Sequence, residues 1–161
     1  MLTLITDCRR ACPDARTDRA TVTQARRWLD EAIAAGVDRI QLREPWLDAA
    51  RLAELAGGLQ RAADGSPTRI VINDRADVAR AVGVPAVHLR DDGWPVARVR
   101  ALFDAPVLVG QSIHDAGAAA RSQADYVHVG AVFGSGDKPA GGLDLLRAVA
   151  AVSRVPVHAV G

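Results

Sequence analysis

Short apolar runs recur along the chain, and a segment with helical periodicity follows most of them. The runs are rich in valine and isoleucine and hardly alternate between apolar and polar positions, which is typical of strands buried on both faces. The pattern predicts seven strands, at Leu2–Thr6, Asp38–Arg43, Arg69–Asn73, Ala86–Leu89, Pro106–Gly110, Asp125–Gly130 and Val155–Val160.

The segments between these runs are amphipathic. Apolar residues recur at helical spacing in two longer segments and four shorter ones, namely Val22–Ala35, Leu47–Ala63, Arg75–Val82, Pro95–Phe103, Ala116–Ser122 and Leu143–Val152. Gly36 and Gly83 stand where C-terminal helix caps belong. Alternating strands and helices predict βαβ units and a parallel α/β sheet.

Two parallel architectures fit this alternation, a doubly wound sheet and a (β/α)8 TIM barrel. Polar residues gather at the carboxyl ends of the predicted strands, where barrel enzymes carry their chemistry, and no GxGxxG follows the first strand. We therefore expect one barrel domain over residues 1–161, incomplete at about seven strands and lacking the last βα unit. An unclosed sheet keeps open edges, which would allow a homo-oligomer.

Composition narrows the class of partners. Lys and Arg number 20 against 19 Asp and Glu, so the net charge of +1 gives no reason to expect nucleic acid or an anionic membrane. No apolar stretch approaches the ~18 residues of a membrane span. The N-terminus lacks the basic region and the longer apolar run that are typical of a signal peptide. We expect a cytoplasmic protein in which Cys8 and Cys12 are incidental thiols in a loop.

Polar residues end the second and third predicted strands. Gln41 and Arg43 share one face by strand periodicity, and Arg suits bidentate capture of phosphate or carboxylate. The alternative is a structural pair between Arg43 and Glu44. Asn73 and Asp74 could bind a substrate ring and Mg²⁺, or could simply cap the next helix.

The fifth and sixth strands are followed by further candidates. Ser112 and His114 are two residues apart and share a face, and a histidine there can move protons near neutral pH. The glycine-rich segment after the sixth strand contains Ser135 and the only lysine, Lys138, which could bind an anion. A zinc hydrolase built on His88, His114, His128 and His158 is a weaker alternative, because two of these histidines lie within their strands.

These segments, in this order, resemble the thiamine-phosphate synthase/TenI family over almost the whole chain. The matching pieces are LITD (Leu4–Asp7), IQLRE (Ile40–Glu44), VINDRADVA (Val71–Ala79), VPAVHL (Val84–Leu89), VGQSIHD (Val109–Asp115), ADYVHVGAVF (Ala124–Phe133), DKPAGGL (Asp137–Leu143) and VPVHAVG (Val155–Gly161).

The resemblance implies a TIM barrel that acts in thiamine biosynthesis on phosphorylated pyrimidine and thiazole ligands. Family synthases join hydroxymethylpyrimidine diphosphate to thiazole phosphate with Mg²⁺ and release pyrophosphate. Some TenI relatives instead tautomerise a carboxythiazole phosphate through the SxH histidine, without a cofactor. The implied substrate-binding residues are Gln41, Arg43, Asn73, Ser112 and Ser135; Asp74 is the implied Mg²⁺ ligand, and Lys138 and His114 are the implied catalytic residues.

Three positions depart from the synthase pattern. Pro45 replaces a lysine, Gly93 replaces a second Mg²⁺-binding aspartate, and Asp137 places an acid beside Lys138. Family sequences also continue GGI after the seventh strand, where the thiazole phosphate rests, whereas this sequence stops at Gly161. The three departures and the retained His114 lead us to expect a TenI-type tautomerase with His114 as proton shuttle, whereas the missing GGI region counts against both activities. The alternatives are a thiamine-phosphate synthase and a non-catalytic binding or regulatory barrel.

Overall fold

The computed structural model describes residues 1–134 and 141–160. Within them strands alternate with helices, and the chain divides into two compact units, Met1–Ala86 and Val87–Gly161. The prediction of a single domain stays a prediction. No helix in the described part is long and apolar enough to cross a bilayer.

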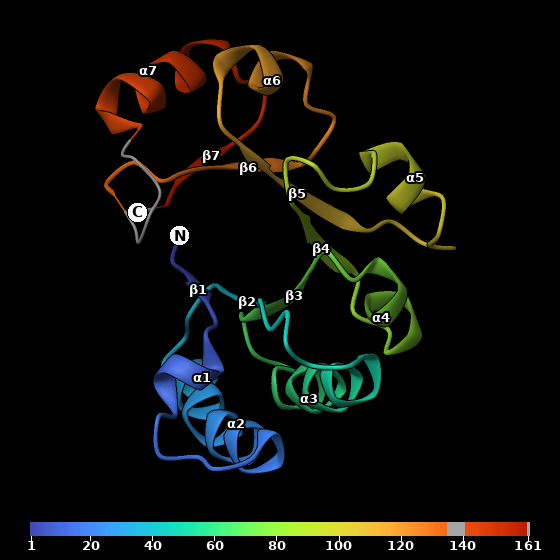
Figure 1. Cartoon of the computed structure of the whole chain (residues 1–161). Coiled ribbons are helices and arrows are strands. Elements are labelled where there is room, and N and C mark those ends of the chain that lie inside the picture. Colours follow the sequence, from blue (N-terminus) through green and yellow to red (C-terminus); the bar gives the residue numbers. More distant parts are fainter. Residues whose placement is uncertain (135–140, 161) are drawn as a thin grey trace. The chain divides into compact units, whose positions relative to one another are not determined.

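The first unit contains three parallel strands and the helices that follow them (Figure 1). Strand β2 lies between β1 and β3, with Leu4 opposite Ile40 and Ile40 opposite Ile70. Helix α3 packs against β3 and contacts both α2 and α4. The elements are β1 (Thr3–Ile5), α1 (Cys8–Ala11), α2 (Asp18–Ala34), β2 (Arg39–Leu42), α3 (Ala49–Ala62), β3 (Arg69–Asn73) and α4 (Ala76–Ala81).

Strand β4 (Ala86–Leu89) begins at the last residue of the first unit, and the remaining elements belong to the second. Strand β6 lies parallel between β5 and β7, with His128 opposite both Ser112 and His158. The elements are α5 (Val96–Arg100), β5 (Leu108–Ile113), α6 (Ala116–Arg121), β6 (Tyr126–Val129), α7 (Gly142–Val152) and β7 (Val157–Ala159).

Local chemistry explains where the longer helices begin and end. Thr17 and Asp48 cap α2 and α3, because their side-chain oxygens accept hydrogen bonds from the backbone N–H groups of Ala20 and Arg51. Beyond α2 the chain turns at Gly36, whose φ of 78° is costly for any residue with a Cβ.

The core of the second unit lies between its strands and the last two helices. Ile113, Val127 and Val129 pack there with Ala119 of α6 and Val149 of α7, all of them buried. The side chains that alternate with these on β5 and β6, at Ser112, Tyr126 and His128, therefore lie on the opposite face of the sheet.

The predicted parallel α/β fold is confirmed, while several elements differ from their predicted bounds; helix α2, for example, begins at Asp18 and not at Val22. The segment that contains Cys8 was expected to be a loop, but Cys8–Ala11 forms the short helix α1, and both cysteines are buried. Strand β5 was expected to end at Gly110 and instead runs to Ile113, so Ser112 lies inside the strand.

Candidate functional site

Three of the predicted binding residues meet at one edge of the first unit. Strands β2 and β3 pair with Gln41 opposite Val71, so Gln41, Arg43 and Asn73 lie on the same face, toward the carboxyl ends of the strands. The Arg43 side chain is exposed, whereas Gln41 is only 2% exposed. The buried Nε2 of Gln41 has no hydrogen-bond partner among the described residues. This edge therefore holds a buried donor beside an exposed cation.

Asp74 follows β3 in an unusual backbone conformation. Its φ of 62° lies in the left-handed region, which few residues other than glycine adopt and which is often found at functional sites. The N-cap of α4 is Arg75, whose side chain makes no capping hydrogen bond. The alternative that Asn73 or Asp74 occupies the capping position is therefore wrong.

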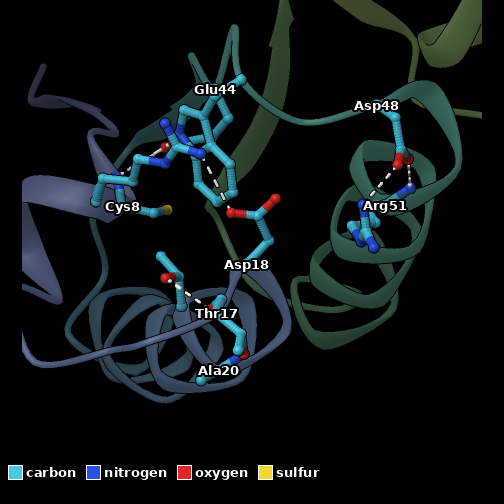
Figure 2. Close-up of polar contacts among 10 residues, drawn as sticks. Cys8, Thr17, Asp18, Ala20, Glu44, Asp48 and Arg51 are labelled. Atoms are coloured by element: carbon cyan, nitrogen blue, oxygen red, sulfur yellow. Dashed lines mark hydrogen bonds and ion pairs between the residues drawn. The ribbon is translucent and has the colours of Figure 1, made fainter.

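A buried carboxylate fixes the loop after β2. Glu44 is 4% exposed and accepts hydrogen bonds from the Thr6 hydroxyl and from the Trp46 indole N–H at 2.7 Å. It also accepts from the Cys8 N–H at 3.0 and 3.2 Å (Figure 2). The Thr6 oxygen in turn accepts from the backbone N–H of Arg43 at 3.0 Å. Glu44 thus anchors the backbone that carries Arg43, rather than forming the Arg43–Glu44 side-chain pair considered from the sequence.

The same carboxylate changes the character of the nearby thiol. Burial raises the pKa of Cys8 well above its usual range, and the neighbouring negative charge of Glu44 raises it further. The neighbouring Arg9 guanidinium lies 4.3 Å from the centre of the Trp46 ring and 3.2 Å from an Asp18 carboxylate oxygen. Cys8 is therefore a protonated, structural thiol.

In the second unit His114 directly follows β5 and is held from two sides. Its Nδ1 lies 2.7 Å from the carbonyl oxygen of Gly130, and since a carbonyl only accepts, Nδ1 carries the proton in this hydrogen bond. Its Nε2 lies 3.4 Å from a carboxylate oxygen of Asp91. The His114 side chain is 44% exposed, so Nε2 is oriented yet accessible for proton exchange.

Ser112 meets a buried histidine on the neighbouring strand. The Ser112 hydroxyl lies 3.1 Å from Nε2 of His88, whose Nδ1 lies 3.3 Å from the phenolic oxygen of Tyr126. His128 and His158, expected to lie within their strands, do so in β6 and β7. Within residues 1–134 and 141–160, no group of three or more His, Cys, Asp or Glu side chains could hold a metal ion.

Lys138 and Ser135 lie outside the described residues, so their roles remain predictions, as do those of the other predicted site residues. Sequence reasoning missed three participants: Glu44 as an anchor, Asp91 beside His114, and Tyr126 beside His88. The sequence contains no clear signal for the first, because Glu44 follows strand β2 among other polar residues. Nothing in the spacing pointed to the other two, because their contacts join different strands and loops.

Comparison with known proteins assigns this chain to one family. A family model described as thiamine monophosphate synthase matches residues 12–161. A putative thiamine-phosphate synthase of Geobacter sulfurreducens is 39% identical over 140 residues, which cover 83% of this chain and 66% of that protein. A thiamine-phosphate synthase of Thermobifida fusca is 37% identical over 158 residues, with coverages of 93% and 71%.

A solved structure extends the comparison to the fold. A thiamine phosphate pyrophosphorylase from Pyrococcus furiosus superposes with a TM-score of 0.78 at 25% identity, covering 99% of this chain and 74% of that one. This supports the incomplete (β/α)8 class predicted from the strand pattern. The chain spans about two thirds of the length of the first curated relatives that it matches.

Proposed function

Because this chain belongs to the thiamine monophosphate synthase family, we propose that it acts as a thiamine-phosphate synthase. The reaction joins hydroxymethylpyrimidine diphosphate to thiazole phosphate and releases pyrophosphate. The names of the relatives favour this synthase over the tautomerase that the sequence departures favoured. A transferase of this kind needs donors for a diphosphate and stabilisation of its departing charge.

The observation that carries the proposal is the buried amide of Gln41. A buried donor without a partner costs about 1–3 kcal/mol, and Nε2 of Gln41 is such a donor among the described residues. A ligand acceptor placed at this edge would satisfy it. Arg43 and Asn73 share the face of Gln41, so the ligand that fits best is anionic and rich in acceptor oxygens.

Asp74 is the residue of this edge that would hold Mg²⁺. Magnesium is commonly bound by one or two carboxylates together with substrate phosphates, and the strained carboxylate-bearing loop after β3 suits that arrangement. When bound, Mg²⁺ would neutralise part of the diphosphate charge. The position of a second aspartate is Gly93 in this sequence, so the diphosphate itself would supply more of the coordination.

The chain's own residues have separate tasks in this proposal. Arg43 binds the diphosphate through its guanidinium, Gln41 donates its amide N–H, and Asn73 orients the pyrimidine or diphosphate end. The family resemblance assigns Ser112 and Ser135 to substrate binding, Ser112 on the diphosphate side, and Lys138 to the departing pyrophosphate. Removing one such electrostatic donor costs on the order of 10²–10³ in rate.

The test is formation of thiamine phosphate from both substrates with Mg²⁺, followed together with pyrophosphate release. We expect wild type to turn over and Arg43→Ala to lose roughly 100-fold. Arg51→Ala is the matched control, because Arg51 pairs with Asp48 on the surface of α3, and it should keep wild-type activity. Failure of the wild-type chain to form any thiamine phosphate would refute the proposal.

A second candidate function rests on His114. Its fixed Nδ1 and accessible Nε2 suit proton transfer on a carboxythiazole phosphate, the tautomerase reaction, which would need no metal. Supplying that tautomer to wild type and His114→Ala tests it, and equal rates in the two proteins would rule His114 out. Binding of thiazole phosphate without turnover in either assay would instead indicate a binding or regulatory module.

A further inference from the structure

Four ring side chains lie together in the second unit, on the sheet face opposite its apolar core. This ring cluster consists of His88, Tyr126, His128 and His158. The ring centres of His88 and His128 are 4.2 Å apart, and the Tyr126 ring stacks 5.1 Å from that of His158. His88, Tyr126 and His128 are at most 5% exposed, so the cluster is a buried polar layer.

His88 bridges Tyr126 and Ser112 within this layer. Its two ring nitrogens lie 3.3 Å from the phenolic oxygen and 3.1 Å from the serine hydroxyl. Gly110 leaves room for the bridge, because a Cβ there would lie 2.2 Å from Cζ of Tyr126 and 2.5 Å from Nδ1 of His88. The packing therefore fixes the order of the three groups.

Hydrogen-bond chemistry gives this bridge a direction. A neutral imidazole has one donor and one acceptor nitrogen, so His88 can accept from only one of its two hydroxyl partners. Phenol is the better donor, since its pKa of about 10 is far below that of an aliphatic hydroxyl. With Tyr126 donating to Nδ1, Nε2–H donates to Ser112, and the Ser112 proton must then point to another acceptor.

We propose that Tyr126 and His88 are positioning residues that orient the Ser112 hydroxyl as a hydrogen-bond donor to a phosphate oxygen of the substrate. This inference rests on the proposed function, in which Ser112 binds the diphosphate. In the opposite arrangement Ser112 would donate to His88 and turn only lone pairs toward the ligand, which repel a phosphate. Tyr126 and His88 thus favour an anion at Ser112 although neither residue contacts the anion.

The test is calorimetric titration of the full chain with inorganic pyrophosphate and Mg²⁺. We expect Tyr126→Phe, which keeps the ring, and Ser112→Ala each to weaken binding roughly two- to tenfold, the range of one hydrogen bond. In the double variant Tyr126→Phe should add nothing to Ser112→Ala, because its effect passes through the serine. An equal additional loss in the Ser112→Ala background would overturn the proposal.

Variants at His88 give a second readout. His88→Gln retains an N–H that can reach Ser112 and should bind pyrophosphate more tightly than His88→Leu, which cannot donate. Glu31→Gln on the exposed side of α2 is the control and should stay near wild type, because its side chain lies outside the ring cluster. Glutamine and leucine giving the same affinity would contradict the donor role of His88.

The two proposals fail in different ways. If Ser112→Ala leaves pyrophosphate affinity unchanged, the role given to Ser112 in the proposed function is wrong. If Ser112→Ala weakens binding while Tyr126→Phe does not, the binding role of Ser112 stands and the positioning roles of Tyr126 and His88 are wrong. Circular dichroism melts of each variant separate both results from loss of the fold.

Discussion

Replacing Glu44 by glutamine should destabilise the first unit although the side chain keeps its size. The carboxylate accepts from three donors: the Thr6 hydroxyl, the Cys8 N–H and the Trp46 indole N–H. An amide offers one oxygen and one NH₂ group. Whichever way it is oriented, one of the three donors therefore loses its acceptor: either the Trp46 N–H faces the NH₂ group, or the Thr6 hydroxyl accepts from the NH₂ and its own proton loses the carboxylate.

The size of the loss follows from these contacts. A hydrogen bond to a charged group contributes about 1.5–3 kcal/mol, and a buried donor left unpaired adds its own desolvation cost. The Thr6 oxygen accepts from the Arg43 N–H and keeps a second lone pair for an amide N–H, so in that orientation the loss is the carboxylate acceptor of the hydroxyl proton. We expect Glu44→Gln to lower the free energy of unfolding by about 2–4 kcal/mol.

Urea denaturation followed by far-UV circular dichroism measures this loss. Glu31→Gln on the exposed side of α2 makes the same chemical change without buried partners and should stay within about 0.5 kcal/mol of wild type. Glu44→Gln should also weaken pyrophosphate binding, because the backbone of Arg43 loses its anchor. A Glu44→Gln protein as stable as Glu31→Gln would refute the reasoning.

Three further predictions follow from other contacts. Gly110→Ala forces a Cβ to within 2.2 Å of the Tyr126 ring and should cost about 1–3 kcal/mol in thermal melts, so an unchanged melting temperature would contradict the packing. Cys8, whose pKa burial raises, should react with a thiol reagent at pH 8 only as fast as the chain unfolds, and reaction within seconds would contradict this. The hydrogen bond from Arg75 lowers the pKa of Asp77, so its stabilisation is present above the unfolded pKa of about 3.9 and is lost as the pH falls through the lower folded value. Asp77→Asn should therefore lose at most about 0.5 kcal/mol at pH 7, given the exposure of the pair, and nothing near pH 2; a loss that persists at pH 2 would exclude this ion pair as its cause.

The hydrophobic pattern predicted the fold because parallel strands buried on both faces leave a strong local signature. Strands β3 and β4 were predicted to the residue, and Gly83 has the positive φ expected after a helix. Helix α1 was missed because four residues show no periodicity, and its stability comes from the Asp7 cap and the contacts of Cys8. Such long-range contacts leave no pattern in the local sequence.

The candidate site was predictable only in part. Strand periodicity placed Gln41 and Arg43 on one face, but it could not reveal that the Gln41 amide is buried without a partner among the described residues. Departures at Pro45 and Gly93 led the sequence interpretation toward the tautomerase, whereas the relatives' names favour the synthase. Loss of the lysine at position 45 or the aspartate at position 93 changes the expected rate of the synthase reaction. It does not by itself show that a different reaction is catalysed, and the relatives named thiamine-phosphate synthase are the stronger guide to the reaction.

The alternation of apolar and polar side chains on β6 fixes the position of Ser112 on the neighbouring strand β5. On β6 the valines at 127 and 129 face the apolar core, and Tyr126 and His128 face the other way. A register shift of one residue would place a ring nitrogen or phenol in the apolar core, at about 1–3 kcal/mol for each unsatisfied polar group, and would expose a valine in its place. The side chains on both faces of β6 therefore disfavour a shift in register. Because β5 pairs with β6 from Gly110 to Ile113, the residues that secure the core also fix the distance between Ser112 and the ring cluster.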